Sequence, residues 1–570
     1  MFVAVSEALG VGQSKKKAVL IGATFLLGAG SAQAAVDTST WTVTGSDFVL
    51  SQDLDYTGAT YGRIQGFNGW SGTDTNKLTI AAGSTITGGV FGYENDPFWG
   101  DESNTGAEGS SGLLRYHTFV VNGALKDADT YHDVATNADK PQVGTVNWFN
   151  RLALGTTGVV NVKEVRIAEA FKNDGSLTVN NFYVKDGAEL ENSGTMTVNG
   201  NAVIGTANAT IFDKNLYNIS GEDLTAGSSG SFTNTGTAVV NGTLTAYMDV
   251  LNQKALSAAS FALKKVSNSA NGVLKSTDSS GSSVFGVTDN AGEISLAGTS
   301  TFDAVTNAGK MTLTRNSVLA SLTQTAGSLK AAASLTINGA LDNQAGTLNA
   351  AALTAKSTVK NAADLTVTGL LTATAATTNS GTLSAGQFQV GDVTNADGGI
   401  LNATAADMKS VFGVTNNSGD LSVAGESTFG AVTNAKNLTL AKNAVLASLT
   451  QTAAAGKTTA TAGLTVTGAL DNQAGSITAG TLTAGSTVKN ADAMTVTATF
   501  TAADTVTNAK SITAGTFNFQ DFVNNANAVL KSTDADSVTG SMFGTTDNKG
   551  EINLAGIADF GAVKNAGTVK

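Results

Sequence analysis

The segment TDNAGEISLAG at residues 288–298 is followed by VTNAGKMTLTR at 305–315 and LTQTAGSLKAA at 322–332. The third residue of each near-copy is an amide, and 17 residues separate one amide from the next. The phrase recurs to the end of the chain at intervals that are mostly 16 to 19 residues. A period of this length, sustained over many copies, is typical of a solenoid. The amides that mark the copies are Asn290, Asn307, Gln324, Asn343, Asn361, Asn379, Asn395, Asn417, Asn434, Gln451, Asn472, Asn490, Asn508, Asn525, Asn548 and Asn565.

Apolar and polar residues alternate within each copy, as they do from Val305 to Thr314. Alternation with a period of two predicts a strand that buries one face. The Asn and Gly of the intervening turn suit it because both tolerate left-handed backbone angles. One such unit cannot bury its apolar face alone, so successive units must stack about 4.8 Å apart. The sequence therefore predicts an all-β fold, a parallel β-helix with rungs of about 17–19 residues.

Stacked rungs place like residues above like residues, so the amides are expected to form a buried ladder in which each side chain bonds to the next. Gln324 and Gln451 fit this hypothesis because glutamine is the other amide that can stack. The alternative is a solvated turn residue at each of these places, without a ladder.

The composition excludes several classes of protein. The 570-residue chain has 65 Gly, 2 Pro and no Cys, and its formal net charge is −12. Regular Val and Leu alternation with almost no Pro argues against disorder. An acidic chain with few basic clusters is not expected to bind nucleic acid. Without Cys, disulfides and thiolate metal sites are ruled out.

Three regions follow one another along the chain. Residues 1–34 are predicted to be an export signal, with Lys15–Lys17, an apolar run and the cleavage motif Ala32-Gln33-Ala34. Residues 35–170 hold all four Trp, both Pro and both His, and we interpret them as an aromatic N-terminal cap with irregular first rungs. A binding or catalytic head built on loops is the alternative for this region.

Residues 171–570 are predicted to form regular rungs, interrupted by a loop at about 201–229. A block duplication begins at about residue 272. Its mark is the phrase SVFGVT at 283–288 and 410–415, which returns as SMFGTT at 541–546. Each block holds about seven rungs, so tandem duplication of whole blocks is the simplest explanation.

No motif predicts chemistry, and we assign no catalytic, cofactor-binding or metal-ligating residue and no cofactor. Ser300 lies in a weak match to a subtilase serine motif, and 456–458 read as the end of a phosphate-binding loop, but neither motif is complete. Asp127, Asp129 and Asp133 could gather a calcium ion, yet a solvated acidic loop is the favoured interpretation. We therefore predict that the chain is not an enzyme.

Phe2–Glu7 and Gly12–Lys17 resemble the end of the extended signal peptide of type V secreted proteins. Together with the rungs and composition, the chain resembles the passenger domain of a monomeric autotransporter adhesin of Gram-negative bacteria. The resemblance implies a right-handed β-helix, export across the inner membrane, and a place at the cell surface, in the outer membrane or outside the cell. It implies a function in cell adhesion or aggregation and, as partners, host or bacterial cell-surface molecules.

The same resemblance implies an outer-membrane barrel as translocator, and neither Tyr nor Trp, which form barrel girdles, occurs after Tyr247. We therefore expect the chain to be a fragment that lacks the barrel, and we expect its open last rung, ending at Lys570, to self-associate. Two alternatives stay open: a haemagglutinin-like exoprotein of two-partner secretion, and a hydrolase or lyase that uses the β-helix as a scaffold.

Overall fold

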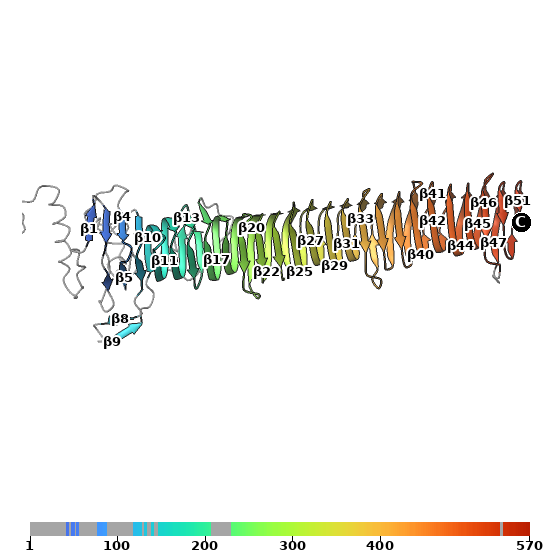
Figure 1. Cartoon of the computed structure of the whole chain (residues 1–570). Helices are drawn as coiled ribbons and strands as arrows, with labels where there is room; N and C mark the ends of the chain where they lie inside the picture. The colour runs from blue at the N-terminus through green and yellow to red at the C-terminus, as the bar shows by residue number, and fades with distance from the viewer. Residues whose placement is uncertain are drawn as a thin grey trace, which may run out of the picture. The chain divides into compact units, whose positions relative to one another are not determined.

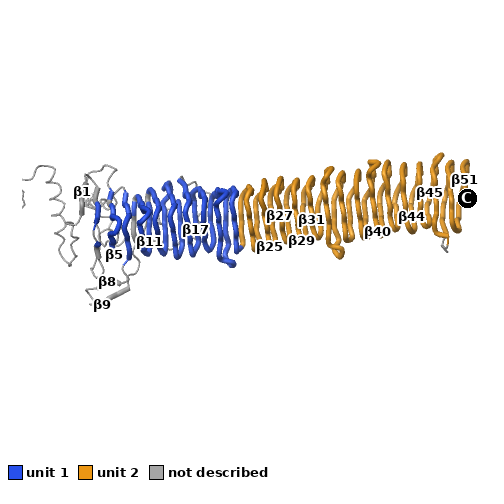
Figure 2. The backbone as a smooth tube through the Cα atoms, viewed as in Figure 1, with its two compact units in different colours: residues 1–298 blue, residues 299–570 orange. Residues whose placement is uncertain are grey.

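The computed structural model describes residues 41–44, 47–51, 53–55, 77–87, 118–127, 130–133, 138–141, 146–206, 230–535 and 540–570. The predicted export signal at 1–34 lies outside these residues. The chain divides into two compact units, residues 1–298 (unit 1) and 299–570 (unit 2), which are described separately (Figure 2).

Each unit is a parallel β-solenoid whose strands pair with strands of the neighbouring rung (Figure 1). The predicted all-β parallel β-helix is therefore confirmed, whereas its right-handed sense stays a prediction. The described residues include no helix, so none that is long and apolar enough to cross a membrane.

Unit 1 contains strands β1 to β21. They are β1 (Trp41–Thr44), β2 (Asp47–Leu50), β3 (Leu54–Asp55), β4 (Lys77–Ile80), β5 (Thr85–Thr87), β6 (Thr118–Val121), β7 (Ala124–Lys126), β8 (Thr130–Asp133), β9 (Ala138–Pro141), β10 (Val146–Leu154), β11 (Val159–Asn173), β12 (Ser176–Lys185), β13 (Glu189–Asn192), β14 (Thr195–Val198), β15 (Ala202–Thr206), β16 (Ser231–Asn234), β17 (Thr237–Asn252), β18 (Ala255–Asn268), β19 (Val273–Ser276), β20 (Ser282–Asn290) and β21 (Glu293–Leu296).

Unit 2 contains strands β22 to β51. They are β22 (Thr299–Asn307), β23 (Lys310–Leu313), β24 (Ser317–Gln324), β25 (Ser328–Ile337), β26 (Leu341–Asn343), β27 (Thr347–Ala355), β28 (Val359–Asn361), β29 (Asp364–Ala373), β30 (Thr377–Asn379), β31 (Thr382–Val390), β32 (Val393–Asn395), β33 (Ile400–Ala403), β34 (Ser410–Phe412), β35 (Thr415–Asn417), β36 (Asp420–Val423), β37 (Ser427–Asn434), β38 (Asn437–Leu440), β39 (Ala444–Gln451), β40 (Lys457–Val466), β41 (Leu470–Asn472), β42 (Ser476–Ala484), β43 (Val488–Asn490), β44 (Ala493–Asn508), β45 (Ser511–Asn524), β46 (Val529–Ser532), β47 (Ser541–Asn548), β48 (Glu551–Asn553), β49 (Ala558–Phe560), β50 (Val563–Asn565) and β51 (Thr568–Val569).

A rung of unit 2 has three sides, which the rung at 364–379 illustrates. Residues 364–367 form side A and residues 371–373 form side B, and the register of β29 with β31 shifts between these two segments. Strand β30, at 377–379, forms side C. Equivalent residues of neighbouring rungs stack in register, so each position of the rung becomes a column along the unit.

The inward columns form the core that the alternation predicts. Leu365, Val367 and Leu371 are at most 1% exposed, and the polar residues between them face outward. Each fully buried Leu or Val stabilises the fold by about 2 kcal/mol. Aromatic residues stack in the same way, since the rings of Phe412 and Phe429 lie 4.6 Å apart and nearly parallel.

Glycine in the turn that follows the amide serves two purposes. Gly327, Gly346 and Gly475 have the predicted left-handed φ angles. Gly194 and Gly236 do not have left-handed φ angles. A Cβ atom on Gly194 would lie 2.1 Å from the carbonyl oxygen of Gly175, and one on Gly236 would lie 2.2 Å from that of Gly194. The predicted left-handed angle is therefore wrong for these two turns, where close stacking of the chain requires glycine.

The predicted loop at about 201–229 is partly wrong. Residues 202–206 form strand β15, which pairs in parallel with β12 and β17. Residues 207–229 lie outside the described residues. The sequence prediction failed because Ala202–Ile204 bury three successive side chains and therefore lack the alternation of a strand with one buried face.

The first rungs reach back well before residue 171. Strand β2 pairs in parallel with β4, and β4 pairs with β6. Strands β1 and β2 form an antiparallel hairpin, and β8 and β9 form a separate two-stranded sheet. The predicted aromatic cap stays a prediction, because the side chains of all four Trp lie outside the described part of the chain.

Candidate functional site

A buried ladder of amides runs along the end of side C in unit 2. In most rungs the Nδ2 atom of one Asn donates to the Oδ1 atom of the Asn in the next rung, at 2.6 to 2.9 Å. Apart from Asn565, the amides are at most 2% exposed. The predicted ladder is therefore confirmed for these rungs, and the alternative of solvated turn residues is wrong for them.

Several ladder amides, such as Asn361, also close the turn beside them. The Nδ2 atom of Asn361 donates to the carbonyl oxygens of Ala363 and Thr382, both at 2.9 Å, as well as to Asn379. One amide thus ties its own turn to the turn of the next rung. A buried polar group that satisfies several partners in this way fixes the register of the stacked rungs.

Unit 1 carries a ladder of the same kind. Its members are bonded in sequence at 2.7 to 2.8 Å. The repeated phrase also marks Asn173, Asn192 and Asn234, whereas Asn252 and Asn268 were not predicted. The spacing could have found them, because they follow Asn234 by 18 residues and then 16. The members are Asn173, Asn192, Asn234, Asn252, Asn268 and Asn290.

One predicted ladder residue is wrong by one position. Asn524, not Asn525, is buried and accepts from Asn508 at 2.9 Å. The alternation of β45 decides between the two adjacent amides, because Phe522 faces inward and Val523 outward, so the next inward residue is Asn524.

The ladder of unit 2 stops at both glutamines. Gln324 accepts from Asn307 at 2.8 Å, but its Nε2 atom donates to the carbonyl oxygen of Ala326. Gln451 accepts from Asn434 at 2.9 Å, and its Nε2 atom is buried without a partner. The Oδ1 atoms of the next amides, Asn343 and Asn472, are likewise buried without a partner among the described residues. The prediction that glutamine continues the ladder is therefore wrong: it accepts the bond but does not pass it on.

The hydroxyl groups of the two incomplete sequence motifs lie inside the core. The Oγ atoms of Ser300 and Ser317 lie 2.7 Å apart, and Ser300 is 2% exposed. The hydroxyl of Thr458 donates to the Oε1 atom of Gln451 at 2.7 Å. Both hydroxyls therefore serve packing within stacked rungs.

The predicted acidic loop is only partly described. Asp127 accepts from the backbone N–H of Lys163 at 2.5 Å, and Asp133 lies in β8, but Asp129 lies outside the described residues. Within the part of the chain that the structure describes, no group of three acidic or imidazole side chains could hold a metal ion.

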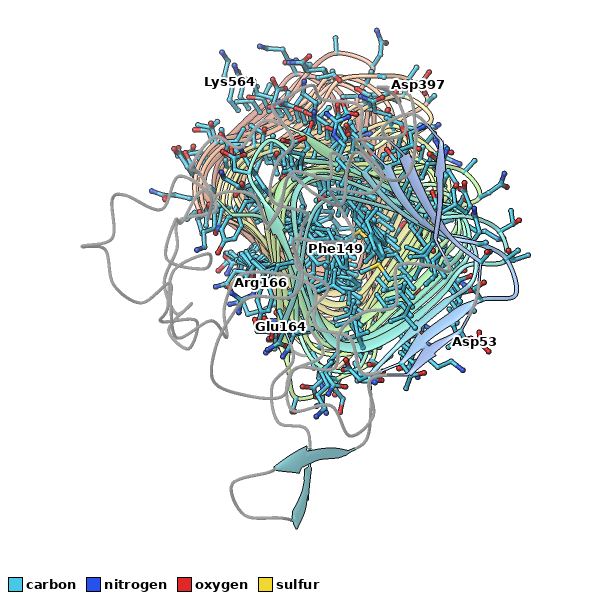
Figure 3. All side chains as sticks on the ribbon, turned by 90° about the vertical axis from the view of Figure 1, so that its left-hand side faces the viewer. Asp53, Phe149, Glu164, Arg166, Asp397 and Lys564 are labelled. Carbon is cyan, nitrogen blue, oxygen red and sulfur yellow. The ribbon has the colours of Figure 1, made fainter. Side chains whose placement is uncertain are left out.

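One ion pair in unit 1 is buried (Figure 3). The guanidinium of Arg166, 1% exposed, donates through Nη2 and Nε to the Oε1 atom of Glu164, each at 2.7 Å, and lies 5.8 Å from the ring of Tyr183. Arg166 therefore contacts both a carboxylate and an aromatic face, and it packs within the rungs.

The outward residues of sides B and C differ in charge. On side C, five of the fourteen outward residues from Thr306 to Asp547 are charged, namely Asp342, Lys360, Asp471, Lys489 and Asp547. On side B none of the corresponding fourteen residues is charged, and the column ends at the charged Asp559 in the next rung. These fourteen, named here the side B column, are Thr301, Val318, Thr336, Thr354, Thr372, Gln389, Val411, Thr428, Val445, Thr465, Thr483, Thr501, Asn518 and Met542.

Few ionisable groups are perturbed by their surroundings. A hydrogen bond from Lys510, followed by one from the backbone N–H of Gly475, holds the pKa of Asp492 below its usual range. The hydrogen bond to Asp249 and its charge raise the pKa of Lys265. Both groups lie in surface ion pairs, which is typical of a solvated surface.

No family model, curated protein or solved structure matches the chain.

Proposed function

We propose that the chain is the passenger region of a monomeric autotransporter, displayed at the cell surface or released from it, where it acts as an adhesive stalk. The observation that carries the proposal is the combination of a buried amide ladder with the uncharged side B column. The ladder fixes successive rungs in register, and the side B column offers a long contact surface. Such a fold suits a structure that holds a binding surface away from a cell.

The proposal includes its route to the surface. The predicted signal at 1–34 directs export across the inner membrane, and an outer-membrane barrel carries the region outward. The partners in this proposal are molecules of a host cell or of a neighbouring bacterial cell.

Surface display is tested with antibodies against the purified chain, applied to intact cells of the source organism. We expect the antibodies to label intact cells or the culture medium, and external protease to remove the cell-bound signal while a cytoplasmic control protein survives. If the chain is detected only after lysis, the proposal is wrong. Adhesion is tested by deleting and restoring the gene, with cell attachment and settling as readouts.

A further inference from the structure

The side B column is unusual for a chain with a formal net charge of −12. It runs for fourteen rungs of unit 2 without a charged residue, and its Val411, Val445 and Met542 side chains are 39 to 48% exposed. Fourteen rungs at about 4.8 Å each give a strip about 60 Å long. Two acidic molecules repel least where their facing surfaces carry no charge.

One oppositely charged pair lies at the edge of this strip, at its midpoint. Lys409 and Glu426 precede Ser410 and Ser427, which stack in register. Lys409 lies in the rung of Val411, and Glu426 lies in the rung of Thr428. These are the seventh and eighth of the fourteen rungs. Both side chains are exposed, and neither forms an ion pair or side-chain hydrogen bond with the described residues.

We propose that side B of unit 2 is a self-pairing surface on which a second copy of the chain lies face to face and antiparallel. A two-fold axis that runs along the strand direction, between the seventh and eighth rungs, keeps each column opposite itself and reverses the order of the rungs. Lys409 of one copy then faces Glu426 of the other, and the contact occurs twice. A two-fold interface must be self-complementary in this way.

The remaining charges along the edges of side B fit the same arrangement. When the rung order is reversed, the first rung faces the fourteenth and the fourth faces the eleventh. Four charged residues at the edges then lie opposite glycines, so no like charges meet there. The pairs are Asp303 with Gly544, Arg315 with Gly515, Lys356 with Gly485, and Lys442 with Gly386.

The size of the strip is sufficient for a specific dimer. A strip about 60 Å long and about 12 Å wide covers about 700 Å² per copy, close to the ~800 Å² that each partner buries in a standard interface. Two flat sheets can pack with a spacing of about 10 Å between their faces. The inference does not depend on the proposed adhesive function, because purified chain is sufficient to test it.

Sedimentation velocity of the full chain from 1 to 100 µM tests the proposal. We expect a reversible dimer, and Val411→Asp with Val445→Asp should weaken it at least tenfold. The matched control places the same two charges on side C of the same rungs, with Asn416→Asp and Thr450→Asp, and should leave the dimer unchanged. A monomer over the whole range, or equal weakening by both pairs of substitutions, would overturn the proposal. Circular dichroism melts confirm that all variants are folded.

A charge swap tests the antiparallel arrangement. Lys409→Glu alone and Glu426→Lys alone each place like charges opposite one another and should weaken the dimer, whereas the double variant should restore it. A zero-length carbodiimide crosslink between Lys409 of ¹⁵N-labelled chain and Glu426 of unlabelled chain should form in the mixed dimer. Absence of both the rescue and the crosslink would exclude this arrangement.

Discussion

The ladder of unit 2 behaves differently at its asparagine rungs and at its two glutamine rungs. From Asn361 to Asn434 each amide accepts from one neighbour and donates to the next. At Gln451 the bond is accepted but not passed on, which leaves one donor and one acceptor buried without partners. One added methylene therefore moves the amide nitrogen out of line, and continuity of the ladder depends on side-chain length as well as on amide chemistry.

The largest effect is expected at an asparagine rung. Asn434→Leu leaves the Nδ2 atom of Asn417 and the Oε1 atom of Gln451 without their ladder partner. We expect a loss of about 3 kcal/mol in the free energy of unfolding, because both groups are buried. Urea unfolding followed by circular dichroism measures the loss. Asn416→Leu, at an outward position of the neighbouring rung, is the control, and an equal loss in both variants would contradict a special role for the ladder.

Gln451→Leu should cost less than Asn434→Leu. Gln451 accepts from Asn434 and Thr458 but donates to no residue, so the substitution also removes a buried donor that has no partner. We expect a loss of about 1.5 kcal/mol, half the cost at the asparagine rung. The ratio of the two losses, measured by the same urea unfolding, tests whether the ladder stops at this residue; a larger loss for Gln451→Leu would show that it does not.

Gln451→Asn should reconnect the ladder. The shorter side chain is expected to accept from Asn434 and to donate to the Oδ1 atom of Asn472, which is buried without a partner. We expect a gain of about 1 kcal/mol. The matched control is Gln473→Asn, which shortens an exposed glutamine nearby and should change stability little. Loss of stability in Gln451→Asn would show that the longer turn after this rung, rather than the methylene, interrupts the ladder.

The smallest effect concerns acid stability beside the second break. Asp492 accepts from the backbone N–H of Gly475, in the turn after Asn472, and pairs with Lys510. Because the pKa of Asp492 in the folded chain is lowered, its contribution is present above the ordinary aspartate pKa of about 3.9 and is lost as pH falls through the folded value. Asp492→Asn should reduce the stability difference between pH 7 and pH 3 by less than about 1 kcal/mol. Asp303→Asn, at an exposed site, is the control, and equal changes would contradict the prediction.

Much of the ladder could be predicted because its amides occupy positions that the alternation of apolar and polar residues marks as inward. Asn361 and Asn379 each follow an apolar or Thr residue by two positions, and both are buried as the alternation requires. Asn252 and Asn268 were not predicted, although they lie 18 residues after Asn234 and 16 residues after Asn252, within the usual interval of the repeat. The alternation of inward and outward residues in β45 would have selected Asn524 over Asn525. The spacing of the repeated phrase does not distinguish the two.

The sequence by itself determined the period, the inward and outward faces of the strands and the column of amides, because each depends on residues a few positions apart. Only the tertiary structure decided which amides donate a hydrogen bond to the amide of the next rung, since that depends on the position of single atoms between stacked rungs. It also decided which outward residues share a column. Rungs of unit 2 vary from 16 to 24 residues, so residues such as Gln389 and Val411, 22 apart, become neighbours only once the turns are folded.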